Sequence, residues 1–197
     1  SGRYDDPCIV YEYSPGRGAD YPKHFLKGYS GYLQSDGYQV YESIVSDLEQ
    51  DPQFPVTNVG CWAHARRKYT DALKASSVKD PPNIVKGIQY CDALFAVEKE
   101  CKYFDPEQRK EYRKNHAEHI LDEYFEWVKT LQNEVLPKSK LGKAVTYSIN
   151  QEKHLRKYLE DGRLENSNNR ALSAGFTYPH LFAKIFNNTG SQIKRCG

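Results

Sequence analysis

Two short motifs carry the residues of this chain whose types and spacing could do chemistry. The first is Asp36, which follows a short apolar run at residues 32–35. The second is the Cys-x-x-His pair Cys61 and His64, which follows another apolar run at residues 54–59 and leads into a basic stretch. Hard divalent cations prefer carboxylate oxygens, and a strand end holds such a group firmly at the rim of a sheet. Together the motifs indicate a metal-dependent, nuclease-like core.

Each motif also has a purely structural interpretation. Asp36-Gly37 is a common turn pair, and the residue types alone favour the turn over a metal ligand. Cys61 and His64 have the spacing of half a zinc site, but a structural zinc site needs four ligands. No second Cys/His pair follows at the usual distance. A buried thiol and a hydrogen-bonded imidazole therefore explain the pair better, and a small zinc protein is the weakest alternative.

Three basic residues, Arg66, Arg67 and Lys68, follow the Cys-x-x-His pair on the same expected helix. They could contact DNA phosphates, although three cations on a helix are more often only its solvated face. The formal net charge is +2, so an argument for DNA binding must rest on local clusters and not on the global charge. Further local basic pairs are Arg109-Lys110, Arg113-Lys114 and Lys194-Arg195.

Two other groups of side chains could bind a metal. His116 and His119 are three residues apart on an expected helix, and Glu123 follows four residues later. A solvated helix face explains these three residues better. The acids within residues 160–165 lie where a helix ends and a turn begins. Helix-end chemistry explains these acids as well as metal binding does.

The expected elements fall into two patterns. Short apolar runs typical of strands lie at residues 8–13, 32–35 and 55–62, and helical spacing is found at residues 38–50 and 63–74. From residue 81 onward the pattern is helical. The expected helices there begin at Pro82, after the cap Asp105 and after the cap Ser139; the second ends before Pro137 and the third at Gly162. We therefore expect a β/α part, then a helical block, and no regular structure at residues 172–197.

Composition narrows the class of protein. The chain has 197 residues with 39% hydrophobic residues and 16 tyrosines, so its core must rely on aromatic side chains. Its 5 cysteines are scattered and form no disulfide framework, which fits a reducing cytosol. No signal peptide or apolar run long enough to cross a membrane is found. Methionine is absent, from which we expect a piece of a longer protein.

Taken together, the motifs resemble the transposases of the insertion-sequence sixty-six family, which are bacterial Asp-Asp-Glu enzymes. The resemblance runs from Tyr11 to Ala171 and is carried, in the family's order, by residues 25–38, 60–69, 138–144 and 158–165. It implies an α/β plus all-α fold, with an incomplete ribonuclease-H-like core and a helical insertion domain. The implied domains are a partial core at residues 1–80, the insertion at 81–137, a helix and turn returning to the core at 138–171, and an irregular tail at 172–197.

The resemblance also implies the chemistry. Three carboxylates of the family hold two Mg²⁺ ions that drive DNA strand cleavage and transfer. Asp36 resembles the second acid, and would be the catalytic and metal-binding residue of this chain. Cys61 and His64 resemble the signature that follows it, in a supporting role. The implied partners are DNA at the transposon ends and an intact transposase copy, in the cytoplasm or on the nucleoid; no membrane and no small-molecule substrate is implied.

This chain departs from the family pattern at two acids. The first acid is expected upstream of residue 1. The third is expected in an Asn-Asn-x-x-Glu-Arg motif, but Asn168-Asn169 is followed here by Arg170-Ala171 and then Leu172-Ser173. The codons CTG-AGC-GCx for Leu-Ser-Ala contain GAG-CGC, which encodes Glu-Arg in another frame. We therefore hypothesise that residues 172–197 are translated out of frame.

One carboxylate cannot hold two metal ions against water, because such sites need several oxygen ligands. We therefore expect a truncated transposase remnant without strand-cleavage activity. One alternative is a residual DNA-binding or transposase-pairing module that uses the basic helices. Another is a helical protein-interaction domain at residues 81–136.

Overall fold

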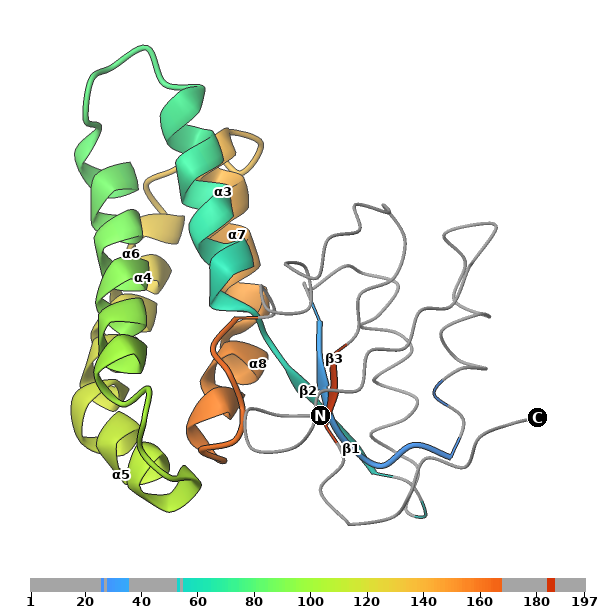
Figure 1. Cartoon of the computed structure of the whole chain (residues 1–197). Helices are drawn as coiled ribbons and strands as arrows, with labels where there is room; N and C mark the ends of the chain where they lie inside the picture. Colours follow the sequence, from blue (N-terminus) through green and yellow to red (C-terminus); the bar gives the residue numbers. More distant parts are fainter. Residues whose placement is uncertain (1–25, 27, 36–52, 54, 168–183, 187–197) are drawn as a thin grey trace. The chain divides into compact units, whose positions relative to one another are not determined.

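The structure is a computed structural model that describes residues 26, 28–35, 53, 55–167 and 184–186 (Figure 1). Within these residues the chain is mostly helical, with a small sheet. The chain divides into two compact units: a sheet unit of residues 1–59 and 170–197, and a helical unit of residues 60–169. The expected strand at residues 8–13 and the expected helix at 38–50 lie outside the described residues.

The sheet of the described residues has the strand order β2-β1-β3. β1 (Gly31–Gln34) pairs in parallel with β2 (Val56–Val59), with Leu33 opposite Asn58. These are the predicted strands at 32–35 and 55–62, with narrower bounds. β3 (Lys184–Phe186) pairs antiparallel with β1. It lies where the sequence predicted no regular structure, because main-chain pairing at a sheet edge needs no side-chain pattern.

The helical unit contains the longest elements of the described chain. Helices α3, α4, α6 and α7 pack on one another in the cyclic order α3–α4–α6–α7, and α5 packs against α4 and α6 (Figure 1). This arrangement buries one face of each of the four helices in a shared core. In chain order the elements are α3 (Trp62–Lys74), α4 (Pro82–Glu100), α5 (Pro106–His116), α6 (Glu118–Gln132), α7 (Lys140–Asn150), α8 (Glu152–Arg156) and a 3-10 helix, η1 (Lys157–Leu159).

The helix starts predicted after Asp105 and Ser139 are confirmed by their capping bonds, and α4 begins at Pro82 as predicted. The Asp105 side chain accepts a hydrogen bond from the Gln108 backbone N–H, and the Gln108 side chain accepts one from the Asp105 N–H, which completes a capping box. Ser139 Oγ accepts a bond from the Gly142 N–H at 2.9 Å. Both caps satisfy N–H groups that the first helical turn leaves without a partner.

Two predicted helices are interrupted in the structure. The helix expected from residue 106 to just before Pro137 divides at Ala117 into α5 and α6, and the helix after Ser139 divides at Gln151 into α7 and α8. Helix α5 turns buried arginines toward α4, whereas α6 turns an apolar face into the four-helix core. A single straight helix cannot present both faces to these partners, so the direction changes at Ala117.

The core of the helical unit is aromatic, as the composition predicted. The buried Trp62 ring lies edge-on to Tyr124, with 5.3 Å between ring centroids. The buried hydroxyls of Tyr69, Tyr124 and Ser148 form a chain: Tyr69 and Tyr124 are 3.1 Å apart, Tyr124 and Ser148 are 2.6 Å apart, and Ser148 donates to the Ala144 carbonyl. Each polar tip thus has a partner inside an apolar core.

Candidate functional site

The Cys-x-x-His motif occupies the start of α3. Cys61 is the N-cap residue of this helix, and its buried Sγ lies 4.0 Å from Ser167 Oγ. His64 is half-buried in the first turn, and its backbone N–H donates to the Cys61 carbonyl at 3.1 Å. In the part of the chain that the structure describes, no three His, Cys, Asp or Glu side chains form a group that could hold a metal ion.

The beginning and the end of the helical unit are joined by main-chain hydrogen bonds. We call residues 60–62 the entry segment and residues 154–167 the exit segment. The Gly60 N–H donates to the His154 carbonyl at 2.8 Å, and the Trp62 N–H donates to the Asn166 carbonyl at 2.8 Å. The Trp62 indole Nε1 also donates to the Leu155 carbonyl at 3.0 Å. The two segments are about a hundred residues apart in sequence, yet they form one junction.

Gly60 makes this close approach of two backbones possible. A Cβ atom at this position would lie 2.9 Å from the Leu155 backbone nitrogen and 3.1 Å from the His154 carbonyl carbon. Both neighbours are main-chain atoms that cannot turn aside as a flexible side chain would. The glycine at the beginning of the Gly60-Cys61-Trp62 motif is therefore required by packing at the junction.

Of the three consecutive basic residues of α3, one is paired with an acid and two are exposed. Arg66 is paired with Asp92 of α4: its Nε lies 2.6 Å from Oδ1, and its Nη2 lies 3.2 Å from Oδ2. This hydrogen-bonded carboxylate raises the pKa of Arg66. Arg67 and Lys68 are exposed, and Lys68 Nζ lies 5.0 Å from the centre of the Tyr147 ring. The cations that α3 offers to an external anion are thus Arg67 and Lys68 near its start and Lys74 in its last turn.

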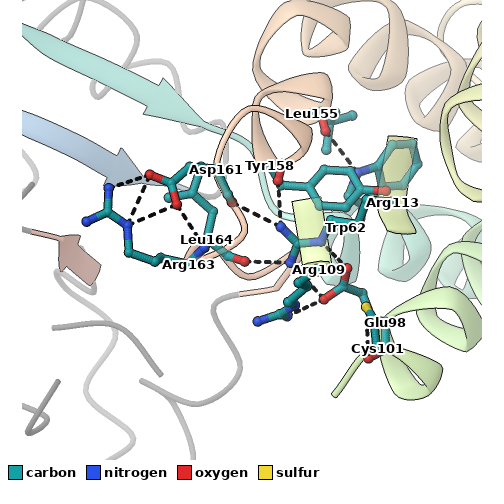
Figure 2. A network of polar contacts seen from close by, with 10 residues as sticks. All are labelled: Trp62, Glu98, Cys101, Arg109, Arg113, Leu155, Tyr158, Asp161, Arg163 and Leu164. Carbon is teal, nitrogen blue, oxygen red and sulfur yellow. Dashed lines mark hydrogen bonds and ion pairs between the residues drawn. The ribbon is translucent and has the colours of Figure 1, made fainter. Parts of the chain in front are cut away.

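A second local basic signal, at Arg109 and Arg113, does not form a cationic surface. Both side chains are 0% exposed. Arg113 Nε lies 2.6 Å from Glu98 Oε1, its Nη2 lies 2.9 Å from Oε2, and Arg109 Nη2 also bonds this carboxylate (Figure 2). Arg109 and Arg113 therefore cannot contact DNA, because they are buried around Glu98; of the two local basic pairs, only Lys110 and Lys114 are exposed.

Arg113 also reaches across to the exit segment. Its Nη1 donates to the Tyr158 carbonyl at 2.7 Å and to the Asp161 carbonyl at 3.1 Å, and its Nη2 donates to the Leu164 carbonyl at 2.6 Å (Figure 2). We call Glu98, Arg109 and Arg113 the arginine clamp. Burial alone would raise the pKa of Glu98, but the hydrogen bonds and charges of the two arginines outweigh it and hold this pKa below its usual value.

The arginine clamp was not predicted from the sequence, although the chain carries a signal for it. Glu98 falls on the apolar stripe of α4, where a carboxylate needs a buried partner. Arg109 and Arg113 are four residues apart, so they share one face of α5. An acid on an apolar stripe, followed by an arginine pair at helical spacing, predicts a buried ion cluster.

Among the described residues, the other predicted ligand groups do not form a metal-binding cluster. His116, His119 and Glu123 are exposed on α5 and α6. Asp161 accepts a hydrogen bond from the Arg163 N–H at 2.8 Å and is also paired with the Arg163 guanidinium. Burial would raise the pKa of Asp161, but these contacts hold it below its usual value. Asp161 therefore acts in the turn that closes the exit segment.

Asp36, the predicted catalytic and metal-binding residue, lies outside the described residues, as do residues 168–172. The residue before it is described: Ser35 is buried, and its Oγ donates to Asn58 Oδ1 at 3.1 Å. No helix among the described residues combines the length and the apolar character needed to cross a membrane.

Comparison with known proteins assigns the family. A family model described as "Transposase IS66 family" matches residues 1–172. An uncharacterized protein of Sinorhizobium fredii, y4qI, is 34% identical over 170 residues, which are 85% of this chain and 31% of that protein. A second from the same organism, y4jD, is 26% identical over 163 residues.

The chain spans about a third of the length of these relatives, since the match to y4qI and the match to y4jD each cover 31% of the longer protein. No solved structure matches the chain. The family match includes the Asp36 motif, the Cys61–His64 motif, the arginine clamp and the junction of the entry and exit segments. This chain therefore belongs to the IS66 family of transposases.

Proposed function

We propose that this chain is a fragment of a DNA transposase whose complete form cleaves and joins DNA strands on a ribonuclease-H-like core. The observation that carries the proposal is the family match over residues 1–172. The parallel pairing of β1 and β2, with Asp36 directly after the buried Ser35, supports it. We place its action in the cytoplasm, on the nucleoid when DNA is bound.

We further propose that this chain does not catalyse strand cleavage by itself. Among the family's three acids, Asp36 resembles the second, and Leu172-Ser173 stand where the third is expected. The described residues contain no further group of acidic, His or Cys side chains for a metal ion. A pair of Mg²⁺ ions needs several carboxylate oxygens, and the residues that the structure describes do not gather such a group. We assign no step to the metal.

A nicking assay tests the lack of activity. Purified protein is incubated with supercoiled plasmid and Mg²⁺ or Mn²⁺, and conversion to the open circle is measured. We expect no conversion above that of a mock preparation. Metal-dependent nicking that disappears in the Asp36→Ala variant would show that the chain assembles a working centre, and would overturn this part of the proposal.

Residual DNA binding is the activity that we assign to the helical unit. Arg67 and Lys68 are exposed on the same helix, and Tyr147 supports the Lys68 ammonium from α7. Cations held on a rigid helix can contact consecutive phosphates without reading the sequence. The same fragment would be able to pair with an intact transposase copy, which binding to a tagged family member would detect.

The salt dependence of binding tests this assignment. The affinity for a labelled duplex is measured between low and moderate salt, and we expect a steep linear fall of log K with log salt. The double variant Arg67→Ala/Lys68→Ala should reduce that slope by about 2, one for each lost phosphate contact. The control Lys99→Ala/Lys114→Ala removes two exposed cations from α4 and α5, and should leave the slope unchanged. Equal slopes in the two variants would refute the assignment to α3.

For residues 172–197 we propose out-of-frame translation. The family match ends at residue 172, which supports a change of reading frame at the Asn-Asn motif. Sequencing the underlying DNA decides the matter. If no other frame restores Glu-Arg followed by family-like sequence, the proposal fails.

A further inference from the structure

The junction of the entry and exit segments joins residues 60–62, at one end of the helical unit, to residues 154–167, the last described residues of the unit. The chain passes between its two compact units at residues 59–60 and again at residues 169–170. Within the helical unit, Gly60 and Trp62 bond to residues 154–166, and Cys61 lies against Ser167. The position of one end is therefore fixed relative to the other by the exit segment.

The exit segment between Tyr158 and Leu164 has little regular structure of its own after the short η1 helix. Three of its backbone carbonyls, from Tyr158, Asp161 and Leu164, accept hydrogen bonds from the single Arg113 guanidinium. Buried carbonyls need donors, and here one side chain from α5 supplies three of them. The Arg113 guanidinium also lies 5.0 Å from the centre of the Tyr158 ring.

A second contact holds the same turn against α5. A Cβ atom on Gly162 would collide with the carbonyl oxygen of Pro106, so the two backbones touch directly at this glycine. Arg113 and Pro106 thus contact the exit segment from the two ends of one helix. Arg113 keeps its orientation because Glu98 binds two of its nitrogens from the opposite side.

Burying the charges of an Arg–Glu–Arg cluster costs desolvation energy that offsets much of their attraction. Apolar residues of similar volume can therefore often replace such a cluster without a loss of stability. A planar guanidinium, by contrast, directs several donors along fixed lines, which neither an apolar side chain nor lysine can do. The cluster is therefore better suited to setting a geometry than to adding stability.

We propose that Arg113 is a positioning residue of the helical unit: held by Glu98, it fixes the exit segment against the entry segment and so sets where the chain leaves the unit relative to where it enters. The helical insertion thereby positions the residues that lead into Asn168-Asn169 against the Cys61–His64 motif. This role goes beyond the proposed function and requires neither activity nor DNA binding.

The reactivity of two buried thiols in the full chain tests the proposal. Cys61 lies at the junction, and Cys91 is buried on α4 in the four-helix core. The native protein is treated with an alkylating reagent, and mass spectrometry of the peptides gives a separate labelling rate for each cysteine. Arg113→Lys should speed labelling of Cys61 by about 10- to 100-fold, because the exit segment loses charge-assisted bonds that resist local opening. Labelling of Cys91 should stay at the wild-type rate.

A second variant separates positioning from stability. In Glu98→Leu/Arg109→Met/Arg113→Met the ion cluster is replaced by apolar side chains, which remove the buried charges but cannot bind the three carbonyls, and the urea midpoint of the variant is measured beside its labelling rates. We expect fast labelling of Cys61 in this variant too, with Cys91 protected. The control Lys114→Ala, an exposed neighbour of Arg113, should match the wild type.

Three outcomes would overturn the proposal. In the first, Cys61 is labelled at the wild-type rate in Arg113→Lys. In the second, Cys61 and Cys91 become reactive together, which means that the arginine contributes only to global stability. In the third, the apolar variant protects Cys61 as well as the wild type does.

Discussion

At the scale of single residues, two basic clusters that look alike in the sequence have opposite fates. Arg67 and Lys68 point to solvent, whereas Arg109 and Arg113 are 0% exposed around Glu98. The residues next to them in sequence do not predict which cluster is buried. Glu98, on the helix that precedes Arg109 and Arg113, makes the difference, so a cation can be buried where the fold provides a buried acid.

The first prediction compares the buried and the exposed acid. Glu98→Ala leaves two buried guanidinium groups without their carboxylate, so we expect a loss of about 3–5 kcal/mol in the free energy of unfolding. Asp92→Ala breaks the Arg66 pair, whose side chains are 38% and 51% exposed, and should cost less than about 1 kcal/mol. Urea unfolding followed by circular dichroism measures both. Similar losses in the two variants would show that Arg109 and Arg113 are not buried around Glu98.

At the scale of elements, the sequence predicted the helix starts better than the helix breaks. Asp105 and Ser139 cap the residues next to them, so a few neighbouring letters are enough. The breaks at Ala117 and Gln151 depend on which distant helix each face meets. No local signal marks them.

Local parts of the candidate site were also predicted better than its long-range contacts. The Cys61–His64 motif and the basic residues 66–68 were found from residue types and spacing, because both lie at the start of one helix. The bonds from Trp62 to Asn166 and from Arg113 to Leu164 could not be found. Both bonds end on main-chain carbonyls, which every residue possesses, across large separations in sequence.

The second prediction concerns the pH dependence of the four-helix core. Burial raises the pKa of Tyr69 from 10.0 to about 12 and that of Cys91 from 9.0 to about 12. The pKa of Tyr124 is also raised well above 10.0 by burial. The folded state therefore favours the neutral forms. The stability that they contribute is complete below the unfolded-state values of 9.0 and 10.0 and is lost as the pH rises toward 12.

Urea midpoints measured from pH 8 to pH 12 should accordingly stay level at first and fall as Cys91 and then the tyrosines ionise in the unfolded chain. The free energy of unfolding should fall by about 1.4 kcal/mol per pH unit for each such group. Tyr69→Phe should make the fall shallower above pH 10, whereas Tyr103→Phe, at a side chain that is 88% exposed, should not. A midpoint that rises with pH, or equal slopes in the two variants, would contradict the buried hydroxyl chain.

At the scale of the whole molecule, the helical unit contains α3 as well as the helices after residue 81. From residue 81 onward the sequence pattern is helical, and this change suggested an insertion at 81–137. The compact unit of the structure is longer, residues 60–169. Helix α3 packs on α4 and α7, and it brings Trp62 and Tyr69 to the core. Residues on both sides of the predicted insertion thus complete its interior.

The third prediction is that residues 60–169 fold without the rest of the chain, whereas residues 82–137 do not. The longer fragment retains the entry and exit segments, the arginine clamp and the complete hydroxyl chain from Tyr69 to Ser148. The shorter fragment loses α3 and α7, which exposes the apolar faces of α4 and α6 and leaves the buried Tyr124 hydroxyl without either partner.

Circular dichroism and thermal unfolding of the two fragments measure the difference. The longer fragment should be helical and unfold in one cooperative transition. The shorter one should show weak helicity that declines gradually with temperature, as short helices without tertiary contacts do. The variant Gly60→Ala in the longer fragment is the matched test of the junction, because its Cβ would lie 2.9 Å from the Leu155 nitrogen and should lower the transition temperature. Cooperative folding of residues 82–137 alone would instead place the boundary of the helical module at residue 81, since α3 and α7 would then be dispensable for its core.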